Sequence, residues 1–261
     1  MIGEQPPNEL LSEFLSIEQL KAIPRPRPLV EGLLNMNSLA WIAGPPGSYK
    51  TFLALDLALH VSSGQNYLGR PVTGQRVAYL AGEGLSGLSA RVEAWSQASK
   101  LPAREAYFLP RAIPVTTQEW YVLCDALRTM RVGMVVVDTQ ARHSGGLDEN
   151  DAPAMSRLVQ SLDAVRVATG GCVATVHHSS KAGSALRGST ALQGAADTVL
   201  TTEVQDGVVT VHNLKQKDMA QACDYWLRPV ETGPSCVLVE CEQPEQPDTR
   251  SDGKKPYSRR E

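Results

Sequence analysis

An eight-residue loop rich in glycine and proline constrains this chain more than any other segment. The loop reads Gly-Pro-Pro-Gly-Ser-Tyr-Lys-Thr, follows the apolar run 39–43 and precedes a helical pattern that begins at Phe52. A strand, such a loop and a helix in this order present backbone N–H groups and the positive helix end to a phosphate group, and a lysine and a hydroxyl complete the site. The predicted phosphate cradle comprises Gly44, Pro45, Pro46, Gly47, Ser48, Tyr49, Lys50 and Thr51. The chain is therefore expected to bind a nucleoside triphosphate, with Lys50 on its phosphates and Thr51 on magnesium.

One residue of the loop departs from the pattern G-x-x-x-x-G-K-[ST], because Tyr49 stands where the second glycine is required. A Gly-Pro-Pro-Gly sequence alone is also compatible with an ordinary turn. Lys50 and Thr51 at the correct spacing, with a strand before and a helix after, favour nucleotide binding. A residue other than glycine at this position must adopt an allowed backbone conformation and direct its ring away from the phosphates, either by stacking on another group or simply by packing.

Length and composition indicate one large α/β domain. The chain has 261 residues, 42% of them hydrophobic, which is ordinary for a packed protein. The net charge of −3 provides no overall basic field for nucleic acid, although a local basic channel remains compatible with it. No signal pattern begins the chain, and its apolar runs are too short to cross a bilayer, so a cytoplasmic protein without membrane contact is expected.

The cysteine pattern indicates neither a disulfide framework nor a metal site. The five residues lack C-x-x-C and Cys/His ligand spacing and are expected to be reduced core thiols. They are Cys124, Cys172, Cys223, Cys236 and Cys241.

Strand-like and helix-like segments alternate from residue 38 to residue 177. The expected strands are 38–43, 76–81, 106–109, 132–138 and 172–177, and the expected helices are 51–62, 86–98, 117–130 and 151–168. Because the run 132–137 is continuously apolar, these strands are expected to form a mostly parallel central sheet with helices on both faces. Segments 197–204, 208–214 and 235–240 are expected to add antiparallel strands at the C-terminal end.

The domain organisation follows from this pattern. Residues 1–30 are expected to form an arm or linker, with an amphipathic stretch at 10–20 and a proline-rich stretch at 23–28. Docking on a neighbouring subunit and plain disorder are both compatible with this composition. Residues 31–242 are expected to form the nucleotide-binding core, and 243–261 a disordered tail.

Acidic residues follow two of the expected strands. Asp138 ends the apolar strand 132–138, where ligands bind in open parallel sheets, so it is the candidate magnesium partner. Glu83 follows the strand 76–81, and a carboxylate there can orient and deprotonate a water molecule that attacks the terminal phosphate. Each acid is also compatible with an ordinary cap or turn.

Histidine and lysine residues end two further strands. His177 and His178 end the strand 172–177, and a polar residue there can contact the terminal phosphate and report its loss to the loop beyond. Metal binding by the pair is disfavoured, because adjacent strand residues point to opposite faces. Lys215 and Lys217 close the strand 208–214 on one face, so both can enter one anionic site, although solvated lysines are common at strand ends.

The ordered motifs resemble those of the RepA-like branch of hexameric replicative helicases, which are AAA-family ATPases of the RecA/DnaB type. The resemblance runs from about residue 29 to residue 240 and includes the tolerance of a residue other than glycine before the lysine. It rests on Gly44 to Thr51, Gly145 to Asp151, His177 to Lys181, Arg187 to Ser189 with Ala195 to Asp197, and Lys215 to Asp218.

The resemblance implies a RecA-like core that binds ATP and Mg²⁺. By that resemblance Lys50 and Thr51 bind phosphate and magnesium, and Asp138 is the strand-end acid. Glu83 is the catalytic base and His178 the sensor of the terminal phosphate. The cationic residues that such rings insert into the neighbouring subunit's site correspond to Lys215 and Lys217, with Arg187 as a competing candidate. The loop 179–187 corresponds to the DNA-facing loop of the central channel.

The expected function is therefore that of an ATP-driven ring motor of six subunits on single-stranded DNA, a replicative helicase with a replication initiator or primase as a further partner. No amino-terminal helical domain of the DnaB kind is evident, and the loop 179–187 has few aromatic residues. An ATP-controlled switch of the recombinase or loader kind, without unwinding, is the alternative. A small-molecule kinase is a third reading, for which no arginine-rich lid segment is seen.

Overall fold

The parallel strands expected from the sequence form the centre of a nine-stranded sheet. The computed structural model describes residues 11–178 and 190–244. The strands of this sheet are β3 (Ser38–Gly44), β4 (Arg76–Ala81), β5 (Ala106–Leu109), β6 (Val132–Asp138), β7 (Cys172–His178), β8 (Thr198–Gln205), β9 (Val208–Gln216), β10 (Tyr225–Thr232) and β11 (Ser235–Cys241). They lie in the order β11-β10-β9-β8-β3-β7-β6-β4-β5. Strands β8 through β5 are parallel, whereas β9, β10 and β11 add antiparallel pairs, so the expected α/β fold class is confirmed.

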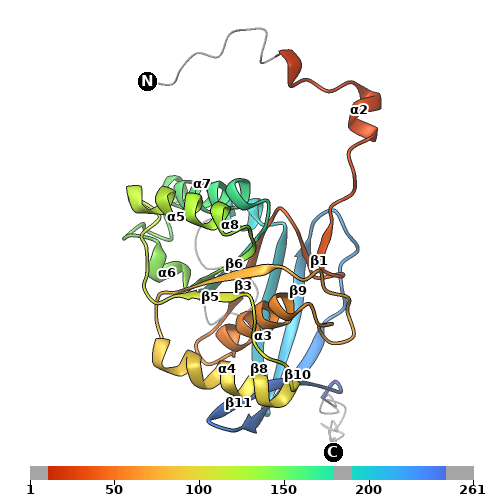
Figure 1. The fold of residues 1–261 in the computed structure, drawn as a ribbon, viewed down its shortest axis with the longest axis vertical. Coiled ribbons are helices and arrows are strands. Elements are labelled where there is room, and N and C mark those ends of the chain that lie inside the picture. Colours follow the sequence, from red (N-terminus) through yellow and green to blue (C-terminus); the bar gives the residue numbers. More distant parts are fainter. Residues whose placement is uncertain (1–10, 179–189, 245–261) are drawn as a thin grey trace, which may run out of the picture.

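Helices cover both faces of the sheet (Figure 1). The described helices are α2 (Ile17–Lys21), which lies apart from the sheet, and α3 (Lys50–Ser63), α4 (Leu85–Ser99), α5 (Gln118–Thr129), α6 (Gln140–His143), α7 (Ala152–Thr169) and α8 (Thr190–Ala195). Helices α3 and α4 pack on one face, and α5, α7 and α8 on the other. Among the described residues, no helix has the length and apolarity needed to cross a membrane.

Strand β6 shows why its sequence is continuously apolar. Met134 and Val136 join the core under α3 and α4, whereas Val135 and Val137 join the core under α5 and α7. Because successive side chains of a strand point to opposite faces, a strand covered on both faces requires apolar residues at every position. The apolar run in the sequence therefore predicted the layering correctly.

Helix α7 begins and ends at residues with clear local causes. The Asp151 carboxylate accepts a hydrogen bond from the Ala154 backbone N–H at 2.9 Å, with Pro153 in the first turn. Such a cap satisfies a backbone donor that the helix cannot. Gly170, at φ 62°, ends the helix. The segment 145–151, which contributed to the family resemblance, therefore leads into a capped helix on the face away from α3.

The chain joins the core earlier than expected. Strands β1 (Pro28–Val30) and β2 (Leu34–Asn35) form a hairpin, and Leu29 and Val30 are fully buried. The expected arm boundary at residue 30 therefore lies inside a packed element. Upstream of the hairpin, α2 has no buried residue, and Figure 1 shows it projecting away from the sheet.

The C-terminal half of the sheet differs from expectation in three ways. Strand β8 is parallel to β3 rather than antiparallel, and β9 extends two residues further, to Gln216. Strand β10 was missed because Pro229 interrupts its pattern. That proline lies beyond the three residues that pair with β9, where a missing N–H is tolerated.

The cysteines are free, but they do not share one environment. Cys124 and Cys172 are buried, Cys236 and Cys241 are half-buried, and Cys223 is exposed. The expectation of five core thiols is therefore wrong for Cys223. The expected contact loop, with Ser179, Ser180, Lys181 and Arg187, lies outside the described residues, as does the tail from residue 245.

A close backbone approach at the start of β7 gives a test of the sheet. A Cβ atom on Gly171 would lie 2.5 Å from the carbonyl oxygen of Gly133, a backbone atom that cannot move aside. We expect Gly171→Ala to lower the free energy of unfolding by about 1–3 kcal/mol. Gly194→Ala is the matched control, since open space surrounds that position in α8 and alanine favours a helix. Urea unfolding measures both; equal stability of the two variants would contradict the close approach.

Candidate active site at the carboxyl edge of the sheet

The phosphate loop is closed by hydrogen bonds to one carbonyl. Pro45 O accepts from Ser48 N at 3.3 Å, from Ser48 Oγ at 2.8 Å and from Lys50 Nζ at 2.7 Å. Lys50 is 5% exposed, and burial lowers the pKa of its ammonium group, an effect that nearby Asp138 opposes. The loop therefore holds a cation at the N-terminus of α3, an arrangement that suits a phosphate group.

Strand β8 supports this loop through a residue that sequence reasoning missed. Ser48 Oγ lies 2.7 Å from Thr202 Oγ1, and a Cβ atom on Gly44 would come within 2.5 Å of both hydroxyl groups. Glycine is therefore needed at residue 44 for close approach. No local signal connects Thr202 with the loop, because the two segments are about 150 residues apart and meet only through the parallel pairing of β3 and β8.

Strand register brings the predicted site residues to one edge. Asp138 pairs with Ala81 on one side and with Val176 on the other, and Val176 pairs with Ile42. Glu83 lies two residues after Ala81, and His178 lies two residues after Val176. His178 pairs with Gly44. Asp138 consequently lies one layer deeper than the other two side chains.

The burial of Asp138 and its hydrogen bonds change the pKa of its carboxyl group. The side chain is 3% exposed; Oδ2 accepts from Tyr79 Oη at 2.6 Å, and Oδ1 accepts from Thr51 Oγ1 at 3.3 Å. Burial raises the pKa of this carboxyl above its ordinary value, and the hydrogen bonds from Tyr79 and Thr51 lower it. Tyr79 is a site residue that the sequence analysis missed, since its apolar strand suggested only a core position.

Thr51 and Asp138 fit a magnesium site. Both supply hard oxygen atoms, and the 3.3 Å contact places them side by side below the loop. Mg²⁺ is commonly held by one or two protein oxygens, with phosphate oxygens and water completing its coordination. In residues 11–178 and 190–244, no cluster of three or more His, Cys, Asp or Glu side chains is arranged to hold a metal ion.

A cavity of 360 Å³ opens beside the loop. Its lining residues come from the loop, from the first turn of α3, from α4 and from the ends of three strands. They are Gly47, Ser48, Tyr49, Lys50, Thr51, Phe52, Glu83, Arg91, Thr139, Val176 and His178. The structure therefore brings Lys50, Thr51, Glu83 and His178 around one space, and it adds Phe52, Arg91 and Thr139, which the sequence analysis did not single out.

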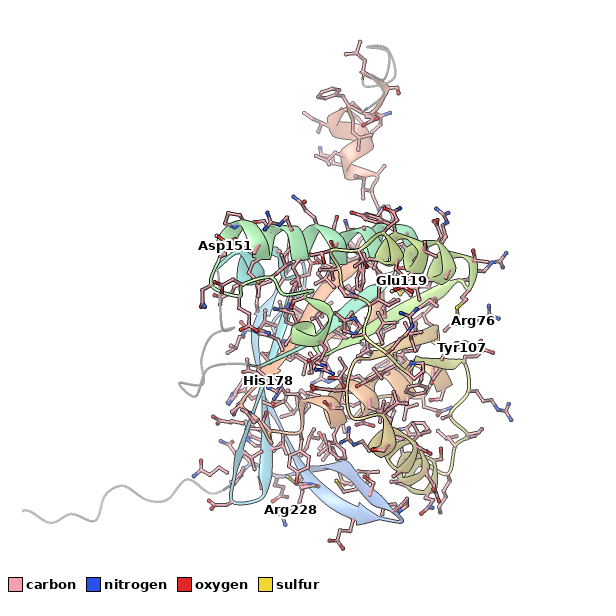
Figure 2. The ribbon with its side chains drawn as sticks, turned by 90° about the vertical axis from the view of Figure 1, so that its left-hand side faces the viewer. Arg76, Tyr107, Glu119, Asp151, His178 and Arg228 are labelled. Atoms are coloured by element: carbon pink, nitrogen blue, oxygen red, sulfur yellow. The ribbon has the colours of Figure 1, made fainter. Side chains whose placement is uncertain are left out.

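The two histidines occupy different environments. His177 is 1% exposed and pairs with Ala43 in β3, whereas His178 is half-buried and lines the cavity. Figure 2 places His178 at the end of its strand, well away from Asp151 at the start of α7. This arrangement agrees with the expectation that adjacent strand residues point to opposite faces, and it makes His178 the histidine positioned for a phosphate.

Lys215 and Lys217 do not line this cavity. Lys215 pairs with Val199, which is level with Trp41, three residues before Gly44. Its Nζ donates to Gln193 O at 2.8 Å and to Gly194 O at 3.1 Å. Lys217 lies just after β9, with its Nζ 3.5 Å from an oxygen of Asp197. Within this chain, both lysines contact groups near the amino end of β8.

The hydrogen bond from Tyr79 to Asp138 gives a pH test. Because only the carboxylate form of Asp138 could hold a metal ion, we expect magnesium-dependent ATP hydrolysis to fall as the pH drops through the pKa of this group. Tyr79→Phe removes a hydrogen bond that lowers this pKa, so we expect the acid limb of kcat/KM against pH to move to higher pH. Tyr107→Phe, on the half-exposed strand β5, is the matched control and leaves the limb in place. If the acid limb of the Tyr79→Phe variant stays at the same pH, the assignment of Asp138 as the magnesium ligand would be contradicted.

Comparisons with known proteins agree with this geometry. A search of curated proteins found no match. Among solved structures, the KaiC-like protein PH0186 from the hyperthermophilic archaeon Pyrococcus horikoshii OT3 aligns with a TM-score of 0.56 and 13% identity, over 81% of this chain and 93% of that chain. This likeness shows a RecA-like fold. The chain also matches AAA_25, described as an AAA domain, over residues 4–184. Because that match spans more than half of the chain and includes the whole phosphate loop with Glu83, Asp138 and His178, the chain belongs to the AAA_25 family and is a P-loop ATPase.

Proposed function

We propose that this chain is the subunit of an ATP-hydrolysing ring, of six copies, that moves on single-stranded DNA as a replicative helicase of the RepA type. The proposal of ATP hydrolysis rests on one observation. Lys50, Glu83 and His178 line one cavity, directly above the Thr51–Asp138 pair. The proposals of a ring and of DNA binding rest on the ordered motifs of the sequence and on the surfaces described below.

Each residue at the cavity has a distinct task in hydrolysis. The Lys50 ammonium and the loop N–H groups would bind the phosphates. Thr51 and Asp138 would hold magnesium, which would supply positive charge to the transferring group. Glu83 accepts a proton from the attacking water, and His178 contacts the terminal phosphate. His178 is the last residue of β7. Loss of the phosphate contact at His178 would therefore change the position of the strand end that leads into the following loop.

An assembled state is supported by groups that this chain leaves exposed. Six large apolar side chains of the arm are each more than half exposed: Leu11, Phe14, Leu15, Ile17, Leu20 and Ile23. Exposed apolar side chains gathered in one short segment favour burial against another surface. A second copy of the chain is the partner in this proposal, and the proline-rich stretch before β1 holds the arm away from its own core.

The cationic residues near the amino end of β8 also fit an assembly. Lys215 and Lys217 are remote from the cavity of their own chain, so a role at a phosphate requires a neighbouring subunit. A cation supplied in trans raises phosphoryl-transfer rates by about 10³ to 10⁵. Arg187 is a further candidate, and with Lys181 it belongs to the loop proposed to contact DNA. A replication initiator or primase would be the partner of the ring.

The first test is ATP hydrolysis with and without single-stranded DNA, across a range of protein concentrations, with Lys50→Ala as the blank. We expect hydrolysis that DNA stimulates and that rises cooperatively with concentration, because each site would need a neighbour. DNA stimulation without strand displacement would favour the recombinase- or loader-like switch. A rate of hydrolysis that changes neither with DNA nor with protein concentration would contradict the proposal of a ring.

The arm supplies a matched pair of variants for the same experiment. Ile17 in α2 and Val167 in α7 are 66% and 67% exposed, so an aspartate at either position leaves the core intact. We expect Ile17→Asp to reduce the assembled fraction in light scattering and to abolish the cooperative rise, whereas Val167→Asp preserves both. Equal behaviour of the two variants would exclude the arm from assembly.

Sharing of sites between subunits has its own test. We expect Glu83→Gln to retain ATP binding and to lower turnover by about 10² to 10⁴. Lys217→Ala is also expected to lose turnover, but through the neighbour's site. Mixing the two variants creates interfaces that contain both an intact base and an intact lysine, so activity should return. No recovery in mixtures that co-assemble would remove Lys217 from the mechanism.

A further inference from the structure

Tyr49 holds a backbone conformation that its residue type disfavours. It caps the N-terminus of α3 at φ 61° and ψ 19°, in the left-handed region, where the phosphate-loop pattern has glycine. A residue with a Cβ atom in this region costs about 1–2 kcal/mol relative to glycine. Its side chain makes no capping hydrogen bond. The presence of tyrosine here therefore calls for a contribution from the ring.

The ring of Tyr49 belongs to a contiguous stack. Its centroid lies 5.4 Å from that of Phe52, with the two planes tilted by 58°. The guanidinium carbon of Arg91 in turn lies 4.4 Å from the Phe52 centroid, a cation–π distance. The phosphate loop, the first turn of α3 and the second turn of α4 are thus connected through three side chains.

Arg91 brings positive charge to the phosphate cavity from within the same chain. It lines the cavity together with Lys50 and Glu83. Within the described ranges it takes part in no ion pair, so its charge is not neutralised by a carboxylate there. A planar guanidinium in this setting suits the oxygen atoms of a phosphate.

The contacts of Tyr49, Phe52 and Arg91 also reach α4, the helix that follows Glu83. Helix α4 begins at Leu85, two residues after Glu83, and Arg91 is anchored on α3 through Phe52. One turn further along, Trp95 Nε1 donates to Asp56 Oδ1 at 3.0 Å, a second tie between the two helices. Two side-chain contacts therefore link α4, the helix that follows Glu83, to α3 beside the phosphate loop.

We propose that Tyr49 is a positioning residue, which acts through Phe52 to hold the Arg91 guanidinium in the cavity, and that Arg91 binds the terminal phosphate of the nucleotide in cis. The proposal rests on ATP hydrolysis at this site and is independent of the ring and of DNA. It accounts for the tyrosine in the glycine position, because the ring contributes a contact that glycine would lose.

A double-mutant cycle separates positioning from simple packing. Tyr49→Gly restores the residue that the backbone conformation favours, so the variant is expected to fold, and thermal unfolding checks this. Arg91→Ala removes the cation, and the two changes are then combined. kcat and KM for ATP are measured at saturating magnesium, together with equilibrium binding of a fluorescent ATP analogue.

We expect Arg91→Ala to lower kcat by about 10² to 10³, as loss of one preorganised charge does, and Tyr49→Gly by about tenfold to 10² through displacement of that charge. The combined variant is no slower than Arg91→Ala alone, because Tyr49 acts through Arg91. Tyr49→Phe, which keeps the ring, rescues turnover relative to Tyr49→Gly. Phe52→Leu, which breaks the stack at its centre, reproduces the loss.

Three results would overturn the proposal. Turnover by Tyr49→Gly equal to or faster than that of the native protein would show that the ring positions nothing required for the reaction. Effects of Tyr49→Gly and Arg91→Ala that multiply in the combined variant would show that the two residues act independently. Loss of nucleotide binding with unchanged kcat in Tyr49→Gly would likewise assign the ring to binding alone.

Discussion

The parallel pairing of β3 with β7 and β8 is the constraint on which the rest of the site depends. It sets Gly44 beside His178 on one flank and brings Thr202 against the loop on the other. Both neighbours are needed, because the loop has few side chains of its own to hold it in shape. A slip of one residue in either pairing would reverse which side chains face the cavity. The tight packing around Gly44 therefore protects the geometry of the phosphate cradle as well as the sheet.

Burial of charge is the second constraint. Lys50 and Asp138 are almost completely removed from solvent, yet neither is left without polar contacts: a carbonyl accepts from the ammonium group, and two hydroxyl groups donate to the carboxylate. Hydrogen bonds of this kind offset part of the desolvation cost. The result is a pair of opposite charges set in place before a nucleotide arrives, so that little reorganisation is needed when it binds.

The structure also shows how a departure from a motif can be accommodated. Tyr49 occupies a glycine position at a conformational cost, and its ring packs on Phe52 beside Arg91. The contact extends the phosphate loop toward α4, which follows Glu83. In this chain Phe52 links the phosphate loop to Arg91 beside the cavity that Glu83 also lines, whereas Lys215 and Lys217 lie apart from that cavity.

Local pattern in the sequence determined the central parallel strands, the helices between them and the place of the glycine-rich loop before α3. Strands 76–81, 106–109 and 132–138 were predicted with their observed bounds, because runs of apolar residues and flanking turn residues are local properties. The sequence also predicted Lys50, Thr51, Glu83 and His178 as site residues, and they line one cavity because the carboxyl ends of parallel strands meet at one edge of the sheet. Tertiary structure alone decided the partners of these residues. Tyr79 on Asp138, Thr202 on the loop and Arg91 on Phe52 lie on other elements, far along the chain, and no local pattern encodes which side chains meet when sheet and helices pack.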